Sequence, residues 1–278
     1  MSVATMDSAV AGVPLTAIQR QAFEVLSVLA KFCDQHGICY YMVGGTLLGA
    51  VRHGGFIPWD DDIDIVIPRP DYRRLLAMID QLPEPLKAIH PSNDKTTPYP
   101  FLVVRRAGSR LVIDYERPFD RGIGVDVFPL DAVPVATWRR RLLFRFLRFM
   151  RSASMNKQRG YYRRQMPLTT RLRFALLSAV NRALPARFIY RAYDLIVAHG
   201  DVCNSVMLGN LYGLYGTREI VDRQVFGEGC WLEFEGQNFR APEHPEQYLA
   251  AVYGDFRCMP PENLRHSGHR IKAVSLDE

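Results

Sequence analysis

The fold is decided by a short acidic stretch, Asp60-Asp61-Asp62-Ile63-Asp64-Ile65-Val66-Ile67, which follows Gly44-Gly45-Thr46 along the chain. Acidic and apolar residues alternate in this stretch with the period of two that is typical of a β-strand. We expect its isoleucines to face the core, and Asp60, Asp62 and Asp64 to share the opposite face. Carboxylates this close repel one another, and a divalent cation between them would offset the repulsion.

The composition is that of a globular protein with a substantial core. The chain has 278 residues, of which 48% are hydrophobic and 23% charged. No apolar run reaches the roughly 18 residues of a membrane-spanning helix, and residues 1–15 lack the pattern of a secretory signal. We therefore expect a cytoplasmic protein.

The cysteines and histidines give no sign of a zinc site. Five cysteines are scattered along the chain without a C-x-x-C pair, which argues against a disulfide framework as well. His266 and His269 form an H-x-x-H pair, but no cysteine or acid close by would complete a metal site. We expect this segment to be a surface tail.

Hydrophobic periodicity and turn residues predict an α+β fold. Helices are expected over residues 16–36, 46–53, 71–81 and 245–253, and strands over 38–43, 60–67, 101–105, 110–115 and 124–130. The strands over 101–105 and 110–115 flank Ala107-Gly108-Ser109 and are predicted to form a hairpin, as are 231–235 and 237–240. Thr16 and Gln19 have the spacing of a capping box for the first helix.

Positive charge is concentrated in residues 132–193, which hold fourteen Arg, Lys157 and no Asp or Glu. We divide the chain into a catalytic core over 1–131, a basic helical insertion over 132–200, with helices over 138–155, 168–184 and 186–200, and a portion over 201–278 that completes the same domain.

The basic insertion has two readings. Residues 138–173 could lie as helices on the anionic inner face of a membrane, or pack on the core with a solvated arginine face. We find no helix-turn-helix, zinc-finger or RNA-recognition motif, so we expect no specific nucleic-acid partner.

The acids point to a metal site. Asp62 and Asp64 would lie about 6.5 to 7 Å apart along one strand face, and ligand sets made only of oxygen favour Mg²⁺ or Mn²⁺. Asp126 lies in the Val125-Asp126-Val127 alternation of a later strand and becomes the third ligand if the two strands pair. Metal ions held by three aspartates are well suited to phosphoryl transfer.

The residues before the acids are suited to binding phosphate. Gly44 and Gly45 leave room for a phosphate at the backbone, and the helix that begins at Thr46 directs N–H groups toward it. Further candidates for binding phosphate charge are Arg52, His53 and Arg105. The plainer alternative is an acidic loop after an ordinary glycine turn. P-loop and dinucleotide motifs do not fit the glycine spacing.

These residues resemble the pattern of the nucleotidyltransferase superfamily, in which a glycine turn precedes Asp-x-Asp and a third acid follows on a later strand. More closely, residues 43–67 are similar to the opening motif of the LicD family, which includes the fukutin-like proteins. Residues 124–131 resemble the segment of the third acid, and Phe234-Glu235-Gly236 and Tyr253-Gly254-Asp255 resemble the C-terminal portion. The resemblance covers roughly residues 15–131 and 205–270.

The resemblance implies a polymerase-β-like mixed sheet flanked by helices. It also implies transfer of a phospho-alcohol, typically phosphocholine from CDP-choline or phosphoribitol from CDP-ribitol, to a hydroxyl of a cell-surface glycan such as lipopolysaccharide or a lipid-linked precursor. Mg²⁺ would be the cofactor, and Asp62, Asp64 and Asp126 would be the catalytic, metal-binding residues.

The resemblance leaves the remaining roles open. Asp61 is a candidate for substrate binding, and Asp60, Asp61, Asp126 or His53 could take the acceptor proton. A choline group prefers an aromatic cage, for which the available candidates are Trp59, Tyr99, Tyr115, Tyr212 and Tyr215.

Two other functions stay open. One is nucleotidyl transfer from an NTP to a small molecule or protein, which would release pyrophosphate instead of CMP. The other is a membrane-associated glycan-binding protein without turnover, against which the presence of all three acids argues.

Overall fold

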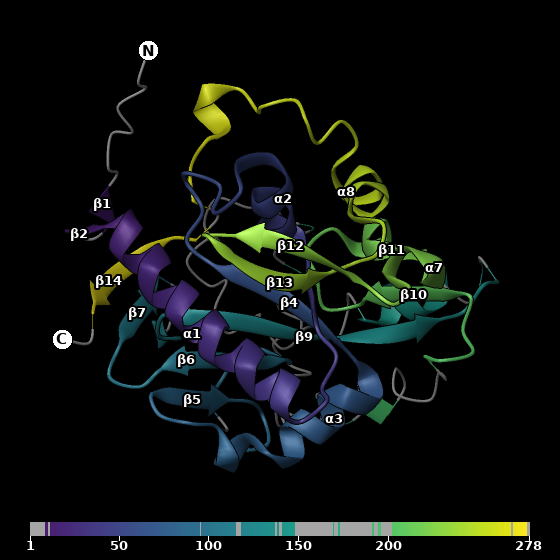
Figure 1. Cartoon of the computed structure of the whole chain (residues 1–278), viewed down its shortest axis with the longest axis horizontal. Helices are drawn as coiled ribbons and strands as arrows, with labels where there is room; N and C mark the ends of the chain where they lie inside the picture. Colours follow the sequence, from purple (N-terminus) through teal and green to yellow (C-terminus); the bar gives the residue numbers. More distant parts are fainter. Residues whose placement is uncertain are drawn as a thin grey trace.

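The computed structural model is organised around one mixed β-sheet (Figure 1). It describes residues 9–10, 12–94, 96–114, 118–136, 138, 141–147, 169, 172, 191, 194–195, 202–267 and 269–276. The seven strands of the sheet are β3 (Tyr41–Met42), β4 (Ile63–Pro68), β5 (Leu86–Ile89), β6 (Leu102–Arg106), β9 (Gly124–Val133), β10 (Met207–Asn210) and β11 (Ile220–Asp222). Together with the helices, this sheet confirms the predicted α+β class.

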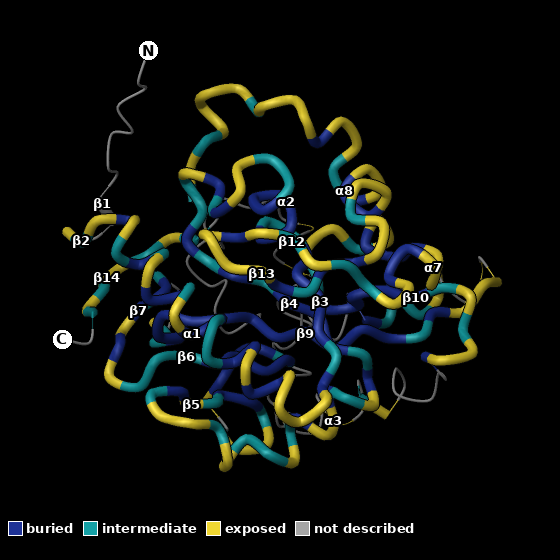
Figure 2. Tube along the Cα trace, viewed as in Figure 1, coloured by how far each residue is buried: buried dark blue, intermediate teal, exposed yellow. Residues whose placement is uncertain are grey.

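Strand β9 is the axis of the sheet. One edge pairs in parallel with β4, with Ile63 opposite Val125 and Asp64 opposite Asp126. The other edge pairs antiparallel with β6 along its first half and with β10 along its second half. Nearly every residue of β9 is buried, as expected for a strand covered on both faces (Figure 2).

The helices cover the sheet and place the glycine turn beside it. Helix α1 (Leu15–Gln35) lies across β6 and β9 and buries an apolar stripe that includes Ile18, Val25 and Leu29 (Figure 1). Helix α2 (Gly44–His53) packs on β4 and on α8 (Pro245–Tyr253), while α3 (Arg69–Ala77) follows β4 directly. The predicted helices over 46–53 and 245–253 are confirmed.

Smaller elements complete the described chain. A hairpin of β12 (Cys230–Phe234) and β13 (Gln237–Ala241) confirms the one predicted there. Strand β14 (Ile271–Ser275) joins β7 (Arg110–Ile113) and β8 (Phe119–Asp120) in a three-stranded sheet. The remaining elements are β1 (Ala9–Val10), β2 (Val13–Pro14), α7 (Arg223–Phe226), η1 (Ile79–Gln81), η3 (Gly216–Glu219) and η4 (Glu262–Leu264).

The predicted hairpin between β6 and β7 is wrong. Strand β6 pairs with β5 and β9, whereas β7 pairs with β14 and β8, so the turn between them carries the chain from one sheet to another. Ser109 stabilises this passage, because its hydroxyl donates to the Arg106 carbonyl and accepts from the Ile123 N–H. The turn residues therefore mark a change of direction and not strand pairing.

The acidic strand and the first helix cap also differ from expectation. Strand β4 begins at Ile63, so Asp60, Asp61 and Asp62 form a loop before it. Helix α1 begins at Leu15 after Pro14 without a capping side chain. Gln19 instead donates through Nε2 to the carbonyl oxygen of Asp60 at 2.8 Å, and so holds the acidic loop.

Most of the basic insertion lies outside the described residues, including most of the helices predicted over 138–155, 168–184 and 186–200 and of the membrane-facing segment 138–173. Residues 141–147 are helical; Phe144 and Leu147 are buried against the core and Leu142 is 63% exposed. Among the described residues, none of the helices combines the length and hydropathy needed to cross a bilayer.

Candidate metal centre

Two of the three predicted metal ligands are placed by the parallel pairing of β4 and β9. Asp64 lies directly opposite Asp126 in the register of these strands. A carboxylate oxygen of each, together with one from Asp62 in the loop before β4, lies within 4.8 Å of the others. The structure therefore brings the predicted triad together, although Asp62 comes from the loop and not from the strand face.

The start of α2 adjoins this carboxylate triad. The Thr46 hydroxyl accepts a hydrogen bond of 2.8 Å from the Asp64 N–H, and Val43 N–H donates to the Asp64 carbonyl. Gly44 has φ +57°, and a Cβ at this position would lie 2.8 Å from Asp64 Oδ2. A Cβ at Gly45 would meet the carboxylate of Asp60. Both glycines are therefore required by the close approach of carboxylates to the backbone.

The carboxylates hold more negative charge than their surroundings balance. Burial raises the pKa of Asp64 well above its usual value, and the charges of Asp62 and Asp126 raise it further. The pKa of Asp60 is raised in the same way, by burial and by Asp62 and Asp61. Burial raises the pKa of Asp126 to about 6, against the attraction of Arg121. A cation would relieve this repulsion.

Arg121 is a residue of the site that the sequence analysis missed. Its guanidinium is 3% exposed, and Nη2 donates to Asp126 Oδ1 at 2.7 Å. Burial opposes its charge, but the attraction of Asp126 outweighs burial and raises the pKa of Arg121. The only local signal is its position five residues before the third acid, next to Gly122 with φ +67°.

The C-terminal segment contributes two further residues, which corrects the prediction of a surface tail. His269 Nδ1 lies 3.2 Å from Asp61 Oδ2 and 3.6 Å from Asp62 Oδ2, and the Ser267 hydroxyl donates to Asp61 Oδ1. Burial lowers the pKa of His269, but the hydrogen bond to Asp61 and the charge of Asp62 outweigh burial and raise it overall. No local sequence pattern predicts these contacts, because Ser267 and His269 lie more than 200 positions from Asp61 in the chain.

The bonds of Asp61 set it apart from the triad. Its side chain is 1% exposed. Burial alone would raise the pKa of Asp61, but the hydrogen bonds and charge of His269, together with Ser267, lower it overall. The carboxylate predicted to bind substrate is therefore occupied by the C-terminal segment.

The three predicted basic residues do not join the carboxylates. Arg52 and His53 lie in the last turn of α2, roughly 12 Å along the helix axis from Gly44. Arg52 Nη1 donates to the Phe256 carbonyl at 3.0 Å. Arg105 lies on β6 with its guanidinium 3.7 Å from Asp120 Oδ1. Their roles in binding phosphate stay predictions.

The aromatic candidates fall in different places. Tyr215 is 43% exposed, and its ring packs edge-to-face on Tyr253 with centroids 5.0 Å apart. Burial raises the pKa of Tyr215, and the charges of Asp64 and Asp60 contribute, which puts this ring within electrostatic reach of the triad. Tyr99 and Tyr212 are buried, Trp59 packs under Arg265, and Tyr115 lies outside the described residues.

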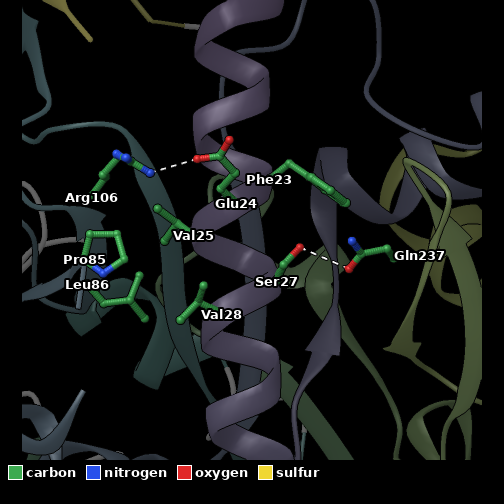
Figure 3. Close-up of a pocket in the computed structure, with 9 residues that line it drawn as sticks. All are labelled: Phe23, Glu24, Val25, Ser27, Val28, Pro85, Leu86, Arg106 and Gln237. Atoms are coloured by element: carbon green, nitrogen blue, oxygen red, sulfur yellow. Dashed lines mark hydrogen bonds and ion pairs between the residues drawn. The ribbon is translucent and has the colours of Figure 1, made fainter. Parts of the chain in front are cut away.

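A separate cavity of about 280 Å³ lies on the outer side of α1 (Figure 3). Phe23, Glu24 and Ser27 of α1 line it together with residues of β5, β6 and β13, and a Glu24–Arg106 ion pair of 2.8 Å closes one side. None of the triad residues lines this cavity. It is distinct from the candidate metal centre.

The donor set fits a divalent cation. Three carboxylate oxygens within 4.8 Å of one another form an oxygen-only set, and burial together with the neighbouring carboxylates raises the pKa of both Asp64 and Asp126. Oxygen-only sets suit Mg²⁺ and Mn²⁺. The residues present could therefore hold one of these ions beside the start of α2.

Comparison with known proteins identifies the domain that carries these residues. Residues 37–145, which contain Gly44, Asp62, Asp64 and Asp126, match the family described as LicD/FKTN/FKRP, nucleotidyltransferase domain. The lipopolysaccharide cholinephosphotransferase LicD of Haemophilus influenzae is 26% identical over 276 residues, which cover 93% of this chain and 98% of that protein.

Two further relatives match a shorter segment. The ribitol 5-phosphate transferases FKRP of Mus musculus and Homo sapiens are each 45% identical over 53 residues, which cover 19% of this chain and 10% of theirs. The family match and the nearly full-length relative agree with the resemblance predicted from residues 43–67. Over residues 37–145 the chain is similar to the LicD family, and over nearly its whole length it is similar to one LicD protein.

Proposed function

We propose that this protein is a LicD-type enzyme that transfers a phospho-alcohol, phosphocholine first, from a CDP-linked donor to a hydroxyl of a cell-surface glycan. The relatives are named as transferases of phosphocholine and of ribitol 5-phosphate, which supports phospho-alcohol transfer at the level of the family. Phosphocholine is the first choice because the match to the cholinephosphotransferase spans nearly the whole of both chains.

The observation that carries this proposal is the convergence of Asp62, Asp64 and Asp126 beside the start of α2. In the proposed roles, the three carboxylates hold Mg²⁺ or Mn²⁺, which when bound would neutralise phosphate oxygens and orient the reacting groups. The parallel β4–β9 pair and the helix after the glycine turn are the arrangement expected of a polymerase-β-like nucleotidyltransferase fold.

The protein groups around the triad have proposed tasks of their own. The N–H groups of Gly45 and Thr46 at the start of α2 would bind phosphate oxygens of the donor, whereas the Gly44 N–H already donates to the Tyr248 hydroxyl. The acceptor oxygen forms a bond to the phosphorus that carries the alcohol, and the bond from that phosphorus to CMP breaks. The acceptor proton passes to a carboxylate of the cluster, and CMP leaves.

The proposed setting is the cytoplasmic face of a membrane, where a lipid-linked acceptor would meet the enzyme. The excess of arginine over residues 132–193 favours contact with anionic lipid. A pull-down with vesicles of phosphatidylglycerol, compared with vesicles of phosphatidylcholine, tests this contact. Salt-sensitive binding to the phosphatidylglycerol vesicles alone supports contact with anionic lipid. Equal recovery with the two kinds of vesicle contradicts it.

The reaction itself is tested with the purified chain, Mg²⁺, a lipopolysaccharide or lipid-linked oligosaccharide acceptor, and CDP-choline, CDP-ribitol or CTP in parallel. We expect CMP release from CDP-choline that increases with acceptor and disappears with EDTA. Faster CMP release from CDP-ribitol would identify ribitol phosphate as the transferred group and would leave the proposed reaction class unchanged. Pyrophosphate release from CTP, without CMP from any CDP-alcohol, would replace the proposal by nucleotidyl transfer.

A further inference from the structure

The third carboxylate of the triad is positioned differently from the other two. Asp64 and Asp126 lie within paired strands, so the hydrogen bonds of the β4–β9 ladder fix their backbone. Asp62 precedes β4 and lies in the loop of residues 60–62. Something other than the sheet must hold this loop if Asp62 is to reach the same point.

Residues 265–267 and 269, here called the C-terminal strap, contact this loop and the residue before it. His269 Nδ1 lies 3.2 Å from Asp61 Oδ2 and 3.6 Å from Asp62 Oδ2. The Ser267 hydroxyl donates to Asp61 and also accepts from the His269 N–H at 3.0 Å. Ahead of them, the Arg265 guanidinium lies 5.8 Å from the ring centroid of Trp59.

The strap is itself anchored at both ends. After it, β14 pairs with β7, and the Arg270 carbonyl accepts from the Asp114 N–H at 2.8 Å. Before it, Arg265 Nε donates to the Pro260 carbonyl at 2.9 Å. Figure 1 shows the yellow C-terminal chain passing from α8 beyond α2 to β14 at the edge of the molecule. The strap is therefore held firmly enough to position another segment.

The hydrogen bonds that the Asp61 carboxylate accepts explain how the strap would position the loop. Two donors of the strap engage its carboxylate, which is 1% exposed, while Gln19 holds the Asp60 carbonyl next to it. An ionised carboxylate only accepts hydrogen bonds, so His269 presents a protonated Nδ1 to it. The strap therefore holds the Asp61 carboxylate and α1 holds the Asp60 carbonyl, so both residues that precede Asp62 are held in place.

We infer that the C-terminal strap, through His269 and Ser267, positions Asp62 for metal binding and completes a centre whose other two ligands the sheet supplies. This inference rests on the proposed function, because it assigns the metal to Asp62, Asp64 and Asp126. His269 and Ser267 are positioning residues here and not ligands. Partners of this kind typically change metal affinity by about 10–100-fold.

Metal affinity in the absence of substrate is the direct test, with Mn²⁺ as the probe and its free-ion signal in electron paramagnetic resonance as the readout. We expect His269→Ala to raise the Kd for Mn²⁺ by about 10-fold or more. His269→Asn keeps an N–H donor close to the position of Nδ1 and should recover most of the affinity. His266→Ala is the matched control, because His266 is exposed on the same strap and should bind Mn²⁺ like the wild type.

A kinetic measurement separates positioning from a loss of folding. The Mg²⁺ concentration for half-maximal CMP release should rise in His269→Ala by the same factor, while kcat at saturating Mg²⁺ returns to within about threefold of the wild type. If His269→Ala does not fold, Ser267→Ala removes one of the two donors and should raise the Kd by several-fold. A purely structural role would lower the urea midpoint and leave the Kd of the folded protein unchanged.

The outcomes are distinguishable. Wild-type affinity for Mn²⁺ in folded His269→Ala and Ser267→Ala overturns the inference and leaves the proposed function in place. Failure of the wild-type chain to bind Mn²⁺ at all overturns both. Weakened binding in His269→Ala with recovery in His269→Asn supports the inference.

Discussion

Strands β4 and β9 carry two buried groups of charges that are arranged in opposite ways. At the first group, Asp64 faces Asp126 across the strands, with Asp62 beside them. Five residues further along the chain in each case, Arg69 at the start of α3 pairs with Asp131 of β9, and both oxygens of Asp131 accept from the guanidinium at 2.6 Å. Positions five apart in a strand point to opposite faces, so Asp126 and Asp131 lie on different sides of the sheet.

The two groups differ in how completely their charges are balanced. Arg69 is 3% exposed and also donates to Asp194 at 2.7 Å, so it is the centre of a satisfied network. Burial raises the pKa of both Asp126 and Asp131 to about 6. Arg69 opposes that rise at Asp131 against the charge of Asp194, whereas Arg121 opposes it at Asp126 against the charges of both Asp62 and Asp61. One group therefore stabilises the fold, and the other holds unbalanced charge suited to a cation.

The largest effect should come from removing one charge of the triad. Asp64→Asn should lower the rate of CMP release by about 1,000-fold or more, because the metal supplies several kcal/mol of transition-state stabilisation. The same variant should unfold at an equal or higher urea concentration in EDTA, since it removes a repelled carboxylate. CMP release by wild type and variant measures the loss of rate, and urea unfolding of both proteins measures the change in stability. Near-normal turnover in the variant would refute the metal assignment.

The opposite pattern is expected at the balanced group. Asp131→Asn should lower the free energy of unfolding by about 3 kcal/mol, because it removes the buried carboxylate that pairs with Arg69 and leaves only the partly exposed Asp194 to balance the guanidinium. Activity per folded molecule should stay within about threefold of the wild type. Urea unfolding followed by tryptophan fluorescence gives the measurement.

A double variant controls for the loss of volume and charge at this group. Arg69→Met with Asp131→Leu replaces both partners by apolar side chains, and should be less destabilising than Asp131→Asn alone. A double variant as unstable as the sum of the two single changes would show that Arg69 and Asp131 are not coupled, and would contradict this account of the pair.

The sequence was informative where local pattern decides structure. The alternation around Asp64 and Asp126 predicted strands, and their pairing brings these carboxylates together as expected. The apolar stripe of α1 and the turn between β12 and β13 were equally local signals. Each of these features depends on residues that are close in the chain, or on one pairing between two hydrophobic strands.

The features of the fold and of the site that the sequence analysis missed depend on contacts between residues far apart in the chain. His269 and Ser267 reach Asp61 from more than 200 positions away, and isolated polar residues near a C-terminus resemble a solvated tail. Asp62 leaves the strand period because β4 begins one residue later, and Gln19 turned out to hold the loop and not a helix end. Strands β6 and β7 are neighbours in sequence, yet their partners come from elsewhere in the chain.

The pH dependence of stability tests whether the pKa of Asp64 in the carboxylate triad is raised in the folded protein. Asp64 has a raised pKa in the folded protein, so between its unfolded pKa of about 4 and the folded pKa the folded state binds the extra proton. Stability in EDTA should therefore rise as pH falls from 7 to 5, and the slope should be smaller in Asp64→Asn by up to about 1.4 kcal/mol per pH unit. Urea unfolding at several pH values measures the two slopes.

The difference between the slopes reports Asp64 together with the acids coupled to it, because the more distant titrating groups are common to both proteins. Asp131, with its pKa of about 6, contributes in the same direction in each. Burial lowers the pKa of His90 to about 4, so its contribution has the opposite sign and stability falls as pH falls through this range. Parallel slopes in wild type and variant would show that the pKa of Asp64 is not raised in the folded protein.

The smallest effect on stability should come from a pair of glycine substitutions that separate backbone strain from crowding of the metal centre. Gly44 and Gly37 have left-handed φ values of +57° and +60°, so alanine at either position should lower the free energy of unfolding by about 1 kcal/mol. A Cβ at residue 44 would lie 2.8 Å from Asp64 Oδ2, whereas one at residue 37 would contact nothing within 4 Å. Gly44→Ala should therefore displace the Asp64 carboxylate and reduce CMP release about tenfold or more, and Gly37→Ala should leave it unchanged. Equal activity in the two variants would mean that the start of α2 and the triad are close in space without acting together.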